Sequence, residues 1–154
     1  EVQLPFLQYL SETEFKFVPI SLGSQDISTS IKVGKIIADT IKSSDKKFVI
    51  VASSDFSHVG FNYMSMPKEG MRVDKYAEFQ DKKAIEKIIK LDPEGLIQIV
   101  KNENISMCGS GPVAAMINAS KILGAKNAEL VKYGTYYEVH PGSSCVGYGA
   151  ISIY

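Results

Sequence analysis

The chain contains 154 residues, of which 45% are hydrophobic and 22% are charged, and its 17 basic and 17 acidic side chains cancel. This composition is typical of one globular domain over residues 1–154, without the basic surface that nucleic acid or an anionic membrane would require. No apolar run approaches the ~18 residues needed to span a bilayer, and Cys108 and Cys145 are expected to remain free thiols in a cytoplasmic protein.

The first half of the chain predicts two helices and two strands. Apolar residues recur at helical spacing within residues 1–10 and, more regularly, within residues 28–42. Residues 15–22 predict a strand, in which Pro19 indicates an edge or a bulge. The run F-V-I-V-A at 48–52 predicts a strand buried on both faces. Residues 57–71 have no clear periodicity and predict a long loop.

The second half predicts three more helices and two strands. A helix is expected from about residue 74 to 90, and Asp92-Pro93 then begins another, with Asp92 as its N-cap. A glycine-rich turn at 108–112 leads into a helix that Gly124 ends. Strands are predicted near 128–137 and 145–154. The alternation of strands and helices predicts an α/β three-layer sandwich with a mixed, largely parallel sheet.

The stretch S-S-D-F-S-H at 53–58 follows a predicted strand directly. In open α/β sheets, ligands bind beyond the carboxyl ends of the strands, so Asp55 and His58 are candidate catalytic residues. An acid and an imidazole three residues apart could share a hydrogen bond, orient a water molecule or bind a metal. The alternative is structural, with Asp55 capping a turn and His58 packing under the loop.

Cys108 precedes Gly-Ser-Gly-Pro and the start of a predicted helix. The positive end of a helix favours the thiolate, which is the form that binds metal or attacks carbon. Cys108 could instead be a small buried hydrophobic residue. The glycine turn could also cradle a phosphate with its N–H groups, although it matches neither common nucleotide-binding motif.

Further interpretations concern a possible hydrolase site, the second histidine and the second cysteine. Ser53, Ser54 and Ser57 stand beside Asp55 and His58, as a Ser/His/Asp hydrolase would require. However, the chain has no G-x-S-x-G elbow, and a catalytic triad is recognised by its geometry in space. His140 precedes Pro-Gly and is interpreted as a turn residue, and Cys145 is interpreted as a core residue at the start of a strand.

Four segments carry a resemblance to a known family. They are E-V-Q-L-P-F-L at the start, V-A-S-S-D-F-S-H-V-G, I-S-M-C-G-S-G-P-V, and S-S-C-V-G-Y-G-A-I-S-I at the end. In this order they resemble the Memo family, which is similar in fold to the LigB-type class III extradiol dioxygenases, a group of non-haem iron enzymes. The resemblance implies an α/β sandwich around a mixed sheet, with a metal pocket at one end.

The resemblance also implies roles for three residues. Cys108 corresponds to the cysteine that lines the metal pocket of Memo proteins, and Asp55 and His58 correspond to residues beside the metal ligands. The two histidine ligands of the family lie upstream, one of them in an E-H-S segment immediately before the E-V-Q-L-P sequence. The chain is therefore expected to be the C-terminal half of a Memo-like protein, without those histidines.

The resemblance leaves two functions open. The first is a metal-dependent redox protein, in which iron or copper is held by Cys108 and two upstream histidines and His58 acts as a general acid or base. The second is a non-enzymatic module that binds a peptide or small ligand in the cleft of Asp55, His58 and Cys108. In either case, the missing N-terminal half or self-association is expected to cover the exposed strands.

Overall fold

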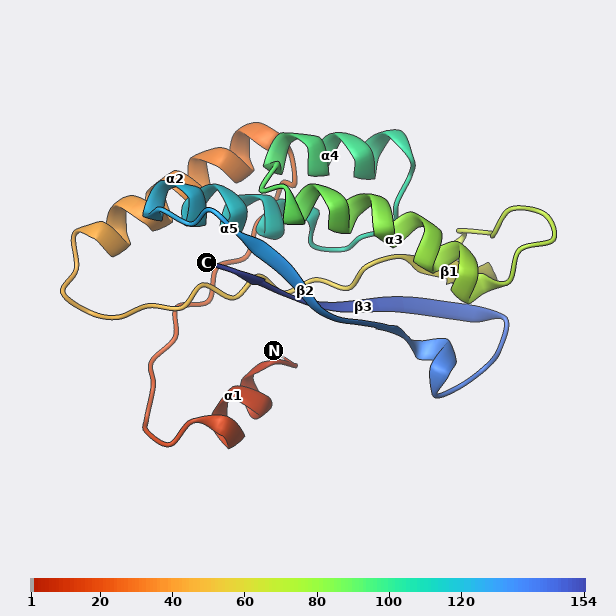
Figure 1. Ribbon diagram of the computed structural model, residues 1–154, viewed down its shortest axis with the longest axis horizontal. Helices are drawn as coiled ribbons and strands as arrows, with labels where there is room; N and C mark the ends of the chain where they lie inside the picture. The colour runs from red at the N-terminus through yellow and green to blue at the C-terminus, as the bar shows by residue number, and fades with distance from the viewer. Residues whose placement is uncertain (1) are drawn as a thin grey trace.

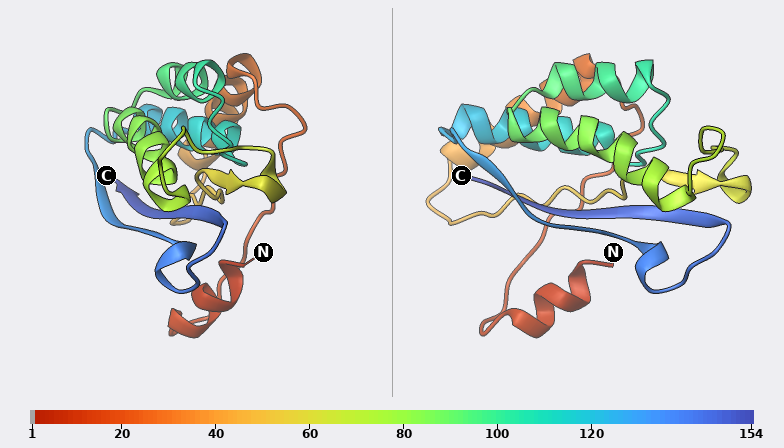
Figure 2. Two further views of the ribbon diagram at one scale, coloured as in Figure 1. Left: turned by 90° about the vertical axis from the view of Figure 1, so that its right-hand side faces the viewer. Right: turned by 45° about the vertical axis from the view of Figure 1, so that its right-hand side comes forward.

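The fold consists of a layer of helices over a small β-sheet, and the computed structural model describes residues 2–154. Figure 1 shows α2 to α5 together on one side of the two long strands, with α1 alone on the opposite side, and Figure 2 shows the same separation from two further directions. The helices are α1 (Leu4–Leu10), α2 (Ile27–Lys42), α3 (Val73–Ile89), α4 (Pro93–Asn102) and α5 (Ser110–Leu123). The strands are β1 (His58–Gly60), β2 (Ala128–Thr135) and β3 (Ser144–Ile153), and two short 3₁₀ helices cover Phe61–Tyr63 and Tyr136–Glu138.

Local signals in the sequence define the helix ends. Asp26 accepts a hydrogen bond from the backbone N–H of Thr29 at 2.9 Å, which caps α2. The carboxylate of Asp92 accepts from the Gly95 N–H at 2.8 Å, so the predicted N-cap of α4 is confirmed. At the end of α5, Gly124 adopts a φ of 106°, a conformation that favours glycine. The predicted helices of the chain are therefore confirmed to within a few residues.

The main core lies between the helical layer and the sheet. Its largest fully buried side chains are Ile88, Leu96 and Ile117, from α3, α4 and α5. The α2 helix packs closely on α5, because Gly34 places its Cα against the backbone carbonyl of Ala115. A second, smaller cluster joins β1 and β3 to the start of α3; its members are Val59, Val73, Ala77 and Cys145.

The sheet is antiparallel and has the strand order β1-β3-β2. The prediction of a largely parallel sheet in a three-layer sandwich was wrong for the part of the chain that the structure describes. The reason is the connection between β2 and β3. It consists only of residues 136–143, whereas parallel neighbours need a crossover of a dozen or more residues. The predicted loop at 57–71 also contributes to the sheet, since β1 forms at its start.

The two predicted strands at 15–22 and 48–52 are not formed in the described part of the chain. No strand is assigned to either segment within residues 2–154. Val49, expected to be buried on both faces, is 89% exposed, and Val18 is 79% exposed. The prediction of a buried strand at 48–52 was therefore wrong. Apolar, β-branched residues favour an extended backbone, but a strand also requires a neighbour.

None of the helices described is long and apolar enough to cross a membrane.

A candidate site of Asp55, His58 and Cys108

Asp55, His58 and Cys108 lie together where the segment 53–58 contacts the turn before α5. The backbone N–H of Asp55 donates a hydrogen bond to the Cys108 sulfur at 3.1 Å. The carboxylate oxygen Oδ2 of Asp55 lies 3.4 Å from Nε2 of His58. The structure thus brings Cys108 next to Asp55, which lies 53 positions earlier in the sequence, and Asp55 next to His58. The resemblance implied that these three residues line one cleft.

Ser106 holds His58 at three points. The Ser106 hydroxyl accepts a hydrogen bond from the His58 backbone N–H at 2.7 Å and donates one to the His58 carbonyl at 2.7 Å. The ring nitrogen Nδ1 lies 2.8 Å from the Ser106 carbonyl, which can only accept, so Nδ1 carries a hydrogen. The Tyr63 ring and the imidazole pack edge to face, with 5.1 Å between their centroids. With Nδ1 fixed in this way, Nε2 is the nitrogen that faces Asp55 and can exchange a proton.

The turn that carries Cys108 is held by two polar side chains. The amide of Gln25 donates to the Cys108 carbonyl at 2.9 Å, and its oxygen accepts from the Gly111 N–H at 2.9 Å. The Ser54 hydroxyl accepts from the Gly109 N–H at 2.8 Å and lies 3.8 Å from the Cys108 sulfur. Cys108 is exposed and unpaired, while Cys145 is buried, so the expected free thiols are confirmed.

These contacts decide between the alternative interpretations of the turn. The backbone N–H groups of Gly109 and Gly111 already donate to side-chain oxygens, so they are not available to cradle a phosphate. The exposure of Cys108 excludes the interpretation of this residue as a small buried hydrophobic side chain. What remains is an accessible sulfur, just before the start of α5, that accepts a hydrogen bond from a backbone N–H.

The hydrolase arrangement is not formed. The Ser54 hydroxyl donates to the Asp55 carbonyl at 2.6 Å, and no serine hydroxyl in the described part of the chain is hydrogen-bonded to the His58 ring. A triad needs the serine on one ring nitrogen and the acid on the other. His140 packs its ring 5.4 Å from that of Tyr136, next to the turn in which it was predicted.

Two phenol groups extend the polar surroundings of the site. Burial raises the pKa of the Tyr148 hydroxyl, and the negative charge of Asp55 raises it further. Tyr148 lies on β3 and Tyr63 follows β1, so the two tyrosines come from elements beside the His58 segment. Neither tyrosine was predicted from the sequence, because neither has a spacing that relates it to Asp55 or His58.

A buried acid, Asp81 of α3, binds the backbone of the segment that carries Asp55 and His58. Its carboxylate accepts hydrogen bonds from the Ser57 N–H at 2.8 Å and from the Tyr133 hydroxyl at 2.7 Å, and its side chain is fully buried. Burial raises the pKa of Asp81. Since Ser57 stands between Asp55 and His58, Asp81 helps to fix the backbone that presents both residues. Sequence reasoning missed Asp81, although it lies on the same helical face as Ala77 and Ala84.

The Asp81→Asn variant is expected to remove a pH-dependent loss of stability. The folded-state pKa is raised above the unfolded value, so this stability is fully present below about pH 4 and is lost as the pH rises through the folded pKa. Asparagine cannot ionise. The test is a series of urea unfolding curves between about pH 4 and pH 8. Asp45→Asn, at an exposed position, is the control, and equal pH slopes for wild type and Asp81→Asn would contradict the prediction.

A metal ion would need more ligands than this cluster offers. Among residues 2–154, no three His, Cys, Asp or Glu side chains are placed so that they could hold one ion. Asp55, His58 and Cys108 are neighbours, but their donor atoms do not surround a common point. The residues therefore fit a part of a metal site and not a complete one.

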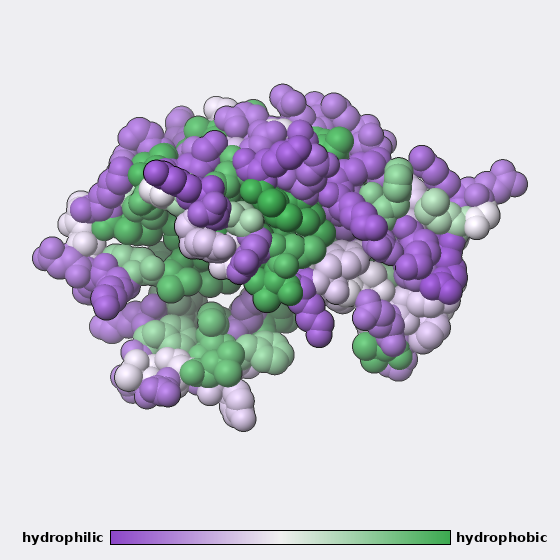
Figure 3. All heavy atoms as spheres, in the orientation of Figure 1, coloured by the Kyte–Doolittle hydropathy of each residue, from purple (hydrophilic) through white to green (hydrophobic). Residues whose placement is uncertain are grey.

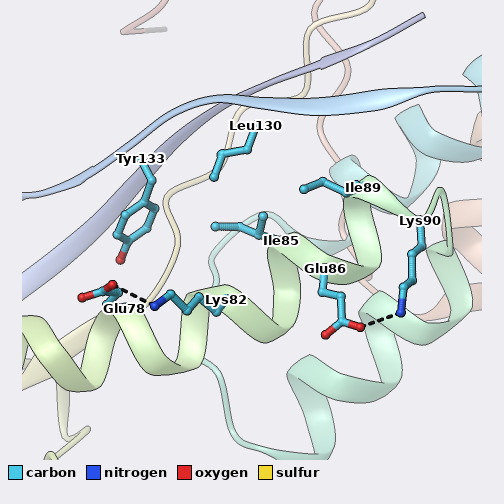
Figure 4. Close-up of a pocket in the computed structure, with 8 residues that line it drawn as sticks. All are labelled: Glu78, Lys82, Ile85, Glu86, Ile89, Lys90, Leu130 and Tyr133. Atoms are coloured by element: carbon cyan, nitrogen blue, oxygen red, sulfur yellow. Dashed lines mark hydrogen bonds and ion pairs between the residues drawn. The ribbon is translucent and has the colours of Figure 1, made fainter.

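A groove of about 460 Å³ lies elsewhere, between α3 and β2. Figure 4 shows Ile85, Ile89 and Leu130 along it, with the Tyr133 ring at one end. Its charged residues form the ion pairs Glu78–Lys82 and Glu86–Lys90. The groove includes none of the three site residues, and its charges neutralise one another. We interpret it as an exposed edge of the core.

The fold and the cluster define an α/β protein with an accessible cysteine at the start of a helix and an Asp–His pair beside it. The sequence matches the Memo-like protein family over residues 1–152, and the chain belongs to this family. The family resemblance of the four sequence segments is therefore confirmed.

Several archaeal relatives are similar over nearly the whole chain. The MEMO1 family protein MK0963 of Methanopyrus kandleri is 42% identical over 152 residues, which are 98% of this chain and 50% of the relative. A MEMO1 family protein of Methanococcoides burtonii is 42% identical over 153 residues, or 99% of this chain and 53% of the relative. A MEMO1 family protein of Methanococcus maripaludis strain C6 is 44% identical over 157 residues, which are 99% of this chain and 51% of the relative. The chain spans about half the length of these curated relatives.

Proposed function

We propose that this chain contributes one side of a metal-binding redox pocket for iron or copper, related to that of the extradiol dioxygenases. Cys108 is the proposed metal ligand, and Asp55 and His58 are the proposed acid/base groups. The observation that carries the proposal is the 3.1 Å hydrogen bond from the Asp55 N–H to the sulfur, next to the Asp55–His58 contact. This contact links the sulfur, through the Asp55 backbone, to a residue pair that can hold a proton.

The donor types suit this choice of metals. Thiolate sulfur binds Cu(I) and iron well, and imidazole suits both metals. A bound ion would supply Lewis-acid or redox chemistry. Since three ligand groups do not converge in the described part of this chain, further ligands have to come from outside it. The upstream histidines implied by the family resemblance are the proposed source.

His58 and Asp55 have distinct roles in the proposal. The Ser106 carbonyl holds the hydrogen on Nδ1, so the Nε2 atom of His58 is left to give or take a proton. The Asp55 carboxylate, 3.4 Å away, stabilises that proton and orients the ring. Asp55 also ties the pair to the sulfur through its backbone N–H.

The Cys108→Ser variant is expected to bind Cu(I) at least about tenfold more weakly than wild type, because an alcohol replaces a soft sulfur ligand. The measurement is competition with a chromophoric chelator under anaerobic, reducing conditions, repeated with Fe(II). Cys145→Ala is the matched control, since Cys145 is only 1% exposed. Equal affinities for wild type and Cys108→Ser would refute the role of Cys108.

A second candidate function is a non-enzymatic module that binds a peptide or small ligand. The incomplete set of metal donors in the described residues favours it, as does the exposure of Cys108. Saturable binding of a ligand that is unchanged by a metal chelator, without turnover, would support this candidate over the redox pocket.

A further inference from the structure

We propose that the groove between α3 and β2 is the contact surface of a symmetric dimer, and that its occupant is a second copy of this chain. The two copies meet through their α3 helices in antiparallel orientation, with the two-fold axis at the level of Ala84. The inference uses neither Cys108 nor metal binding, so it does not depend on the proposed function. It is carried by two observations: the apolar floor of the groove and the order of the charges along α3.

The floor of the groove is apolar and accessible. Figure 4 shows Ile85, Ile89 and Leu130 in the space between α3 and β2. Ile89 and Leu130 each leave 37% of their surface exposed. Figure 3 shows a patch of hydrophobic surface near the middle of this face of the molecule, where Figure 1 places α3 above β2, and hydrophilic surface borders the patch. An accessible apolar floor with a polar border is a feature of protein contact surfaces.

The charged residues beside this floor alternate in sign. They stand four residues apart along α3 and its C-cap, in the order Glu78, Lys82, Glu86 and Lys90. Residues four apart lie on the same face of a helix, so this face reads negative, positive, negative, positive from its start to its end. The two signs are equal in number. A strongly acidic or strongly basic partner would therefore gain no net attraction from this face.

The same order of charges is complementary to itself when it is reversed. In the antiparallel dimer, Glu78 lies opposite Lys90 of the second copy, and Lys82 lies opposite Glu86 of the second copy. Every charge then faces one of opposite sign. Parallel helices in the same register would instead place glutamate against glutamate and lysine against lysine, which repel each other. The charge order therefore favours a second copy of this chain as the occupant, and it favours the antiparallel orientation.

The ion pairs within one chain are compatible with this contact. Glu78 pairs with Lys82 and with Lys75, and Glu86 pairs with Lys90. The Lys82 side chain is 71% exposed, and those of Glu86 and Lys90 are each 60% exposed. Exposed pairs of this kind contribute little to stability and rearrange readily. Since a carboxylate has about four acceptor sites, it can bind a lysine of its own chain and a lysine of the second copy together.

Charge reversal at two facing positions tests the dimer. We expect the wild-type chain to dimerise with a Kd of about 10–100 µM, measured by sedimentation equilibrium. In a dimer of Lys82→Glu, the new carboxylate faces Glu86 of the second copy, so like charges meet twice. In a dimer of Glu86→Lys, the new ammonium group faces Lys82 of the second copy. Each variant alone is expected to dimerise at least about tenfold more weakly than wild type.

An equimolar mixture of the two variants restores the opposite charges. In the mixed dimer the new carboxylate of Lys82→Glu faces the new ammonium group of Glu86→Lys, and the unchanged Glu86 of one copy faces the unchanged Lys82 of the other. The mixed dimer is expected to have a Kd within about threefold of the wild-type value. Recovery on mixing also shows that both variants are folded.

Lys35→Glu is the matched control, because it reverses a lysine of an exposed ion pair on α2, outside the groove. Its Kd is expected to equal that of wild type. A wild-type chain that stays monomeric up to about 500 µM would overturn the proposal. A dimer that neither single reversal weakens would overturn it as well, as would two weakened variants that do not recover on mixing. Because no metal is added, these outcomes leave the metal-binding test of Cys108 unaffected.

Discussion

The Gly147→Ala variant is expected to lose about 3 kcal/mol of its free energy of unfolding. A Cβ atom at position 147 would collide with Oδ2 of Asp81. That carboxylate cannot move aside cheaply, because the Ser57 N–H and the Tyr133 hydroxyl hold it in a buried position. The added methyl group must therefore either displace β3 or leave a buried carboxylate short of a hydrogen bond.

Urea unfolding of Gly147→Ala, wild type and Gly142→Ala measures this effect. Gly142 is the control, because a Cβ there meets no atom within 4 Å. The control is expected to unfold at the wild-type midpoint or slightly above it. A Gly147→Ala midpoint equal to that of Gly142→Ala would show that Asp81 tolerates displacement, and that its hydrogen bonds do not fix the strand.

The Gly109→Ala variant is expected to lose about 2 kcal/mol of stability and most of the metal affinity attributed to Cys108. A Cβ at this position would lie 2.6 Å from the Ser53 carbonyl oxygen and 2.6 Å from the Cβ of Ser54. Backbone has to move to relieve these contacts. The movement separates the turn from segment 53–55 and lengthens the hydrogen bond from the Asp55 N–H to the sulfur.

Thermal unfolding and chelator competition with Cu(I) together test Gly109→Ala. Gly23→Ala is the control, since Gly23 has open space around it and lies before α2. We expect the control to match wild type in both measurements. Loss of stability with unchanged Cu(I) affinity would argue that the contact between the turn and Asp55 does not prepare the sulfur for a metal.

The parts of the fold that could be predicted from sequence are those with local causes. Helix α2 was expected over 28–42 and forms over Ile27–Lys42. Its apolar stripe and its Asp26 cap both depend only on residues close together in the sequence. The same is true of Asp92 and Gly124.

Pairing and burial could not be predicted in the same way. The sheet direction depends on which strands meet, and segment 48–52 is exposed because none of the described strands lies beside it. The contact of Asp55 with Cys108 joins residues 53 positions apart, and only the family resemblance indicated it. Asp81 was missed because an acidic residue is not expected on the buried face of a helix. Its spacing from Ala77 and Ala84 could have placed it on that face.

The register of β1 against β3 has a consequence for how the chain can change over evolution. His58 pairs with Val146, and Val59 pairs with Cys145, so alternate residues of one short strand face the site and the core. Inserting or deleting one residue between Ser53 and His58 would exchange these faces, placing valine at the site and an imidazole in the core. Selection is therefore expected to tolerate substitutions in this stretch more readily than any change in its length.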